Sequence, residues 1–168
     1  PERIPGLGAL RQADAVIANF HPPATELIDK SGPPVVAWIA NLKPMKRPEV
    51  FVRLAAALSD LTDVRFVMAG ADQTAGAPQA WRRRVSEGIT AGGNLQYLGH
   101  LSQADANALL ARSVVFVNTS TQEGFPNTFV QAWLRDVVVC SLTVDPDGAL
   151  ARRGLGILAG DEDTLAAV

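Results

Sequence analysis

The sequence predicts an α/β fold built on a doubly wound parallel sheet, and three observations predict it. Apolar runs rich in β-branched residues alternate with amphipathic segments along most of the chain. Most of these runs are continuously apolar, as expected of strands that helices cover on both faces. The connections between them are short and hold turn-forming residues. For 168 residues, we expect about one domain with a core of its own.

Each expected strand is a short apolar run bounded by polar or turn-forming residues. In chain order the runs are 15–18, 35–39, 64–68, 95–98, 114–117, 137–140 and a weaker one at 156–158.

Each expected helix carries apolar residues at three- and four-residue spacing. In chain order the helices are 48–60, 78–89, 102–112 and 128–135, with a last one at 164–168 that the end of the sequence cuts. Ser102 and Asp105 form a capping-box pattern at the start of the third.

Composition excludes several functional classes. The single cysteine, Cys140, excludes an intramolecular disulfide and a cysteine-based zinc site. The net charge of −2 argues against a nucleic-acid partner. The longest apolar run, 137–142, is far shorter than the roughly 18 residues that span a membrane. The first residues show no signal peptide and no initiating Met, so we expect a cytoplasmic fragment of a larger protein.

The first candidate site is the basic loop 41–48, which follows the expected strand 35–39. Lys43, Lys46 and Arg47 stand beside a helix start, a combination that suits a phosphate group. The glycine spacing of a P-loop or of a dinucleotide fingerprint is absent. A solvated basic loop is the alternative on the local pattern alone.

The second candidate site is the loop 118–128, which follows the strand 114–117. Gly124 permits a close approach of the backbone. Asn127 as N-cap, or Pro126 as the first helical residue, marks a helix start. The amides of Asn127 and Thr128 would then face an anion.

Glu123 and Gln131 belong to the same site. Helical side chains lean toward the N-terminus, so Gln131 is expected to face the same crevice as Glu123. One carboxylate and one amide at that crevice suit the hydroxyls of a sugar or a ribose. The alternative is a strand-to-helix turn with ordinary capping residues.

The histidines are weaker candidates. His21 and His100, together with one cysteine, are too few for a metal site. His100 follows an expected strand and therefore lies on the ligand side of the sheet, where a base could stand.

With these residues in place, the chain resembles the carboxyl-terminal, nucleotide-sugar-binding half of the retaining glycosyltransferases of family 4, which have the GT-B fold. The resemblance covers about residues 35–168. The family's early G-R-L-x-x-x-K-G turn corresponds to Ala40-Asn41-Leu42-Lys43-Pro44-Met45-Lys46-Arg47. Its later E-G-x-x-x-x-x-x-E-A motif corresponds to Glu123-Gly124-Phe125-Pro126-Asn127-Thr128-Phe129-Val130-Gln131-Ala132.

The chain departs from each of the two motifs at one position. Asn41 stands where the early motif has arginine, while Lys46 matches the motif lysine. Lys43 or Arg47 is left to supply the lost charge. Gln131 stands where the late motif has its second glutamate, and it can still hydrogen-bond a ribose hydroxyl as a neutral group.

The resemblance implies a Rossmann-like domain over 35–168, one half of a GT-B fold truncated at its C-terminus, preceded by an interdomain connecting segment over 1–34. It implies a domain that binds a UDP-sugar or a GDP-sugar without a metal, for retaining transfer to a glycan or glycolipid acceptor. Lys46 and Glu123 would be the catalytic residues. The donor-binding residues would be Asn41, Lys46, Leu98, Gly99, His100, Gly124, Phe125, Pro126, Asn127, Thr128 and Gln131.

The partners implied are the nucleotide-sugar donor and the acceptor domain of the same full-length protein, with the inner face of a membrane as an alternative location. The fragment alone is expected to fold, to expose apolar surface around Leu165, and not to catalyse transfer.

Two other readings stay open. One is an enzyme like the nucleotide-sugar 2-epimerases, which share the two-domain architecture. The other is a non-catalytic nucleotide-binding domain, of which Asn41 and Gln131 would be the signs.

Overall fold

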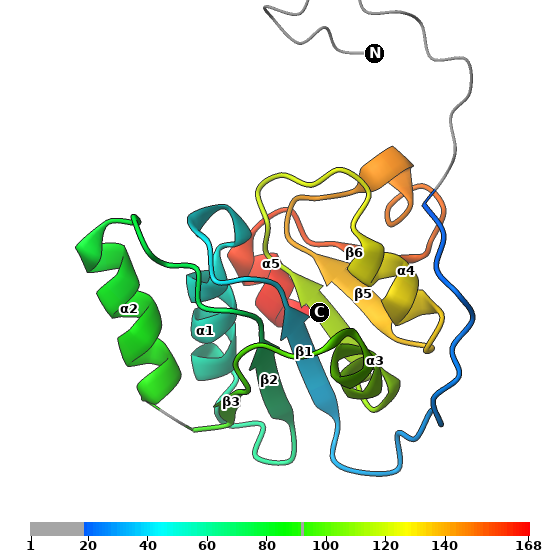
Figure 1. Ribbon diagram of the computed structural model, residues 1–168, viewed down its shortest axis with the longest axis horizontal. Coiled ribbons are helices and arrows are strands. Elements are labelled where there is room, and N and C mark those ends of the chain that lie inside the picture. The colour runs from blue at the N-terminus through cyan, green and yellow to red at the C-terminus, as the bar shows by residue number, and fades with distance from the viewer. Residues whose placement is uncertain (1–18, 92) are drawn as a thin grey trace, which may run out of the picture.

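The computed structural model describes residues 19–91 and 93–168, and it confirms the predicted fold class. Within this part of the chain, six strands form one sheet in the order β3-β2-β1-β4-β5-β6, and all neighbouring strands are parallel (Figure 1). The strand expected at 15–18 and the first half of the connecting segment 1–34 lie outside the described residues.

The elements fall within a few residues of their expected bounds. The strands are β1 (Val35–Ile39), β2 (Arg65–Ala69), β3 (Leu95–Tyr97), β4 (Val115–Asn118), β5 (Val138–Ser141) and β6 (Gly156–Leu158). The helices are α1 (Pro48–Ala57), α2 (Gln79–Thr90), α3 (Gln103–Ala111), α4 (Asn127–Trp133) and α5 (Glu162–Ala167), with short 3₁₀ helices η1 (Pro44–Lys46) and η2 (Pro146–Gly148).

Helices cover both faces of the sheet. Helices α1, α2 and α5 pack together on one face, and α3 packs beside α4 on the other (Figure 1). Successive residues of a strand point to opposite faces. Trp38 of β1 therefore enters the core beside Phe51 and Phe66, while its neighbour Ala37 packs against Leu109 of α3. This alternation explains why the strand sequences are apolar without a break.

The end of the chain corrects one expectation. Leu165 was expected to expose apolar surface, but it is only 4% exposed and packs in the core cluster of α1. Helix α5 reaches that position because Asp161 caps its start, where the carboxylate accepts a hydrogen bond from the Thr164 amide at 2.7 Å. Glu162 then pairs with Arg53 of α1. The last helix is thus part of the core.

Candidate functional site

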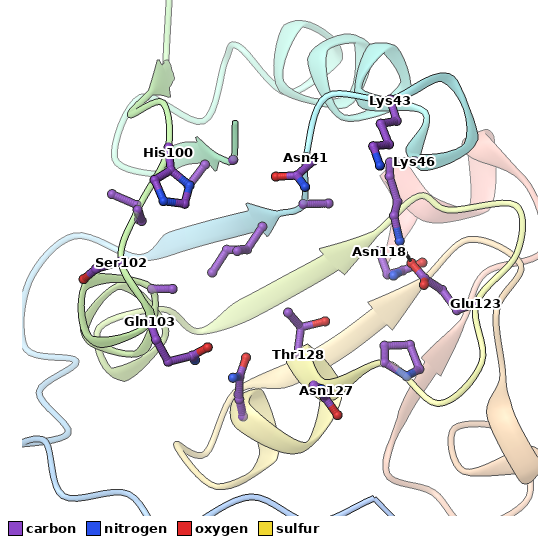
Figure 2. Close-up of a pocket in the computed structure, with 18 residues that line it drawn as sticks. Asn41, Lys43, Lys46, His100, Ser102, Gln103, Asn118, Glu123, Asn127 and Thr128 are labelled. Atoms are coloured by element: carbon purple, nitrogen blue, oxygen red, sulfur yellow. Dashed lines mark hydrogen bonds and ion pairs between the residues drawn. The ribbon is translucent and has the colours of Figure 1, made fainter. Parts of the chain in front are cut away.

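A cavity of about 540 Å³ opens at the carboxyl ends of the strands, where a doubly wound sheet binds its ligands (Figure 2). Its walls come from the segments after β1, β2 and β4 and from the starts of α3 and α4. The polar side chains around it are Asn41, Lys43, Lys46, His100, Ser102, Gln103, Asn118, Glu123, Asn127, Thr128 and Gln131.

Most of the residues predicted from the sequence line this one cavity. They are Asn41, Lys46, His100, Glu123, Pro126, Asn127, Thr128 and Gln131. The two candidate loops, far apart in the sequence, therefore meet at one site. The chemical role of each residue stays a prediction.

Leu98, Gly99, Gly124 and Phe125 are not among the lining residues. The Leu98 amide donates to the Met68 carbonyl at 2.9 Å, and the Gly99 carbonyl accepts from the Gly70 amide at 2.8 Å. These two backbone groups continue the hydrogen bonding of the sheet, and a contact of Leu98 and Gly99 with a base stays a prediction. The Phe125 ring packs edge-on against Trp133, with centroids 6.3 Å apart.

Lys46 and Glu123, the two predicted catalytic residues, form an ion pair at one side of the cavity (Figure 2). Their side chains are 21% and 18% exposed. The Ser120 hydroxyl also donates to the Glu123 carboxylate, at 2.7 Å. The pair holds an ammonium and a carboxylate at defined places on the cavity wall.

A buried relay fixes the backbone of Lys46. The indole N–H of Trp38 donates to Thr119 Oγ1 at 2.9 Å. The Thr119 hydroxyl in turn donates to the Lys46 carbonyl at 2.6 Å. Thr119 is fully buried and carries no local sequence signal, since it stands in a polar loop among other hydroxyl and amide residues. It ties the end of β4 to the turn that presents the lysine.

The departure at Asn41 has a structural role. Its side-chain oxygen accepts a hydrogen bond from the Ala71 amide at 3.2 Å, which joins the loops after β1 and β2. Of the two cations that could replace the missing arginine charge, Arg47 is bound elsewhere, in an ion pair with Glu162 at 2.8 Å. Lys43 lines the cavity instead (Figure 2). Lys43 is therefore the second cation of the site.

Helix α4 begins at Asn127, with Pro126 as its N-cap and no side-chain capping bond. Both alternatives, Asn127 as the N-cap and Pro126 as the first helical residue, are therefore wrong by one position, while the helix start itself is confirmed. The Phe129 amide donates to the Pro126 carbonyl at 3.1 Å. Without a side-chain cap, the amides of Asn127 and Thr128, two residues that line the cavity, remain available to an acceptor.

Gln131 lies one turn further along α4, lines the cavity, and is only 6% exposed. Its side-chain nitrogen lies 3.2 Å from Nε2 of His21. His21 belongs to the segment before β1, and its sequence position gave no reason to place it beside α4.

Within residues 19–91 and 93–168, no three histidine, cysteine, aspartate or glutamate side chains gather as metal ligands would. No helix in the same ranges has the length and hydropathy that a membrane crossing needs. Burial raises the pKa of the Cys140 thiol to about 11, so this cysteine stays protonated in the core.

A family profile, that of the glycosyl transferases of group 1, matches residues 33–168. A search of curated proteins found no significant match.

Solved structures give the same fold. The chain resembles HepE from Anabaena, solved with UDP and glucose, at 23% identity and a TM-score of 0.65 over 79% of this chain and 36% of HepE. It also resembles the C-terminal domain of a group 1 glycosyl transferase, LpcC, from Francisella tularensis, at 14% identity and a TM-score of 0.67. That match covers 86% of this chain and 80% of the LpcC domain. The chain further resembles sucrose-phosphate synthase from Thermosynechococcus elongatus, at 20% sequence identity and a TM-score of 0.63. The match covers 80% of this chain and 34% of the synthase. The chain thus spans about a third of the length of HepE and of the synthase.

Proposed function

The chain belongs to the glycosyl transferases of group 1, and from this premise we propose that it forms the donor-binding half of an enzyme that transfers a sugar from a nucleoside-diphosphate sugar to an acceptor. The donor lies in the cavity at the carboxyl ends of the strands. The acceptor is held by a domain outside this chain.

One observation carries the proposal. Lys46 and Glu123 meet in one cavity although they come from loops far apart in the sequence. Lys43 adds a second positive charge on the same side. Two ammonium groups and the first turn of α4 suit the charge of a diphosphate, and a carboxylate suits the hydroxyls of a sugar.

The same groups account for catalysis of transfer. When the nucleoside diphosphate leaves, negative charge builds on its oxygens. Lys46 and Lys43 stabilise that charge, so the proposal includes transfer without a metal. Retention of the anomeric configuration enters the proposal from the resemblance to the retaining family alone. Glu123 accepts hydrogen bonds from the donor sugar, and Gln131 from the ribose. HepE, which shares the fold, was solved with UDP-glucose, and UDP is therefore the first nucleotide to test.

The test is calorimetric titration of the chain with UDP and with uridine. Lys46→Ala should weaken UDP binding by about 1.5–3 kcal/mol, the contribution of a charged hydrogen bond, and should barely change uridine binding. Arg83→Ala is the matched control, because Arg83 is a cation on α2 whose side chain is 74% exposed. UDP binding that is unaffected by Lys46→Ala would contradict the proposal.

A second experiment uses the enzyme that contains this chain together with its acceptor domain. Glu123→Ala should strongly reduce sugar transfer, because the donor sugar loses its hydroxyl acceptor. Addition of EDTA should leave transfer unchanged. Loss of activity on chelation would show that the two lysines do not suffice for the leaving group.

A further inference from the structure

The segment 19–31, here called the strap, runs from the beginning of the described residues to the loop before β1 and lies beside α4 (Figure 1). Polar contacts hold it there. Asn19 Nδ2 donates to the Phe125 carbonyl at 2.7 Å, and Glu26 pairs with the buried Arg135 at 2.7 Å. Lys30 donates to the Ser113 carbonyl. The strap also contacts α4 itself, which forms one wall of the cavity, because Asn19 Nδ2 donates to Asn127 Oδ1 at 3.2 Å.

Between these contacts, His21 meets Gln131, and its own neighbour determines which ring nitrogen carries the proton. His21 Nδ1 lies 2.9 Å from the carbonyl oxygen of Pro22. A carbonyl oxygen only accepts, so Nδ1 must be the donor. In the neutral ring Nε2 is then an acceptor, and it faces Gln131 Nε2 at 3.2 Å.

This arrangement also determines which way the Gln131 amide points. Because His21 Nε2 offers a lone pair, the NH₂ group of Gln131 must turn toward it, and the carbonyl oxygen takes the other side. That oxygen has no hydrogen-bond partner within the described chain, yet it is not sealed from solvent. Gln131 lines the cavity. An unused acceptor therefore remains at the cavity wall.

We propose that His21 is a positioning residue, which fixes the Gln131 amide so that its oxygen accepts a hydrogen bond from a ribose hydroxyl of the donor. The inference rests on the proposed function, because it requires a nucleotide in the cavity. It also explains how glutamine serves at this position, because the amide offers its NH₂ group to the neutral imidazole while it keeps its oxygen for the ribose.

The test compares UDP with its 2′,3′-dideoxy analogue, which lacks the ribose hydroxyls. His21→Ala frees the amide to rotate, so UDP affinity should fall about three- to tenfold, the effect of one hydrogen bond, while affinity for the analogue stays the same. Gln131→Ala should give the same pattern. His21→Gln should restore UDP affinity to within about twofold, because its side-chain oxygen can occupy the place of Nε2 and accept from Gln131.

Lys30→Ala is the control for loosening of the strap, because Lys30 holds the strap at a point away from the cavity. It should not change the ratio of UDP to analogue affinity. An equal loss of both ligands in His21→Ala, or a loss in Gln131→Ala with none in His21→Ala, would overturn the inference and leave the proposed function standing. Failure of the protein to bind UDP at all would overturn the proposed function itself, and the inference with it.

Discussion

Lys46 is bound within the chain by the carboxylate of Glu123, so a diphosphate has to compete for the ammonium. Both side chains are about one-fifth exposed, at 21% and 18%. Pairs of this kind contribute little net free energy, because part of the attraction is lost to water. Their effect here is to hold the two charges at fixed positions, and under the proposed function Lys46 would meet the phosphates and Glu123 the sugar.

The first prediction concerns this pair. Glu123→Gln removes the negative charge but keeps a side-chain oxygen for the Ser120 hydroxyl. UDP should bind more tightly, by up to about 1 kcal/mol, because Lys46 loses its competing partner. Sugar transfer by the full-length enzyme should fall. Titration at low and at high salt checks the gain, which salt should reduce. Weaker UDP binding in Glu123→Gln would contradict the idea that Glu123 and the diphosphate compete for Lys46.

At this scale the sequence predicted most of the residues that we find on the cavity wall, but not all of their contacts. Lys46 and Glu123 follow strands, so their meeting at one edge was foreseeable. Which of Lys43 and Arg47 lies on the cavity wall could not be predicted from the sequence. Arg47 has a left-handed backbone, with φ of 49°, and its side chain reaches Glu162 of α5. His21 was also missed, since its partner lies in a different part of the chain.

Among the elements, η1 matters most to the site because it ends at Lys46. Backbone and side-chain bonds from the loop after β4 hold it. The Thr121 amide donates to the Met45 carbonyl at 3.0 Å, and the Thr119 hydroxyl donates to the Lys46 carbonyl at 2.6 Å. The turn that we propose to bind the phosphates is thus supported by the loop after β4, which we propose to bind the sugar.

Thr119→Val tests that support. Valine keeps the shape but leaves the buried indole N–H of Trp38 without an acceptor. The free energy of unfolding should fall by about 1–3 kcal/mol, the cost of a buried unsatisfied group. UDP affinity should fall as well, because the Lys46 turn is less well held. Denaturant titration and calorimetry measure the two effects.

Thr121→Val is the matched control, since its exposed hydroxyl lies 3.3 Å from the Met45 carbonyl. Its unfolding free energy should change by less than about 0.5 kcal/mol, as is usual at the surface. Equal effects of the two substitutions would show that the buried relay is not what holds the turn.

The elements were predicted better than their ends. Periodicity locates α1, but the helix stops at Ala57 where 60 was expected, because Ser59 bonds back to Ala56 in a tighter turn. Strand β4 runs on to Asn118, a polar residue that pairs with Ser141 of β5. Both of these side chains are buried. Apolar patterns cannot mark such ends, because tertiary hydrogen bonds decide them.

The N-cap of α5 gives a pH prediction. Hydrogen bonds from the backbone and side chain of Thr164 hold the pKa of Asp161 below its usual range. Its stabilising contribution is therefore present above the unfolded pKa, about 3.9, and is lost as pH falls through the lower folded value. The difference in unfolding free energy between the protein and Asp161→Asn should be constant near neutral pH and shrink in acid. A difference that grows below pH 4 would contradict this.

At the scale of the whole molecule, the last helix, α5, joins the hydrophobic core to the turn that carries Lys46. Arg47, which follows Lys46 directly, and Arg53 both pair with Glu162 at the start of α5. Leu165, one turn later, packs in the core of the sheet face that α1 covers. The same helix therefore supports the core and, through the Arg47–Glu162 ion pair, restrains the turn that presents Lys46.

Leu165→Ala should accordingly destabilise the protein by about 2–5 kcal/mol, because removing a buried leucine loses apolar burial and leaves a cavity. Val168→Ala is the control: Val168 is 64% exposed, and its loss should change unfolding by less than about 0.5 kcal/mol. UDP affinity of folded Leu165→Ala should match that of the unmodified protein, since Leu165 does not line the cavity. Denaturant titration measures the first effect and calorimetry the second. An unfolding free energy as insensitive to Leu165→Ala as to Val168→Ala would mean that α5 is not docked in solution, and that Glu162 does not restrain the turn.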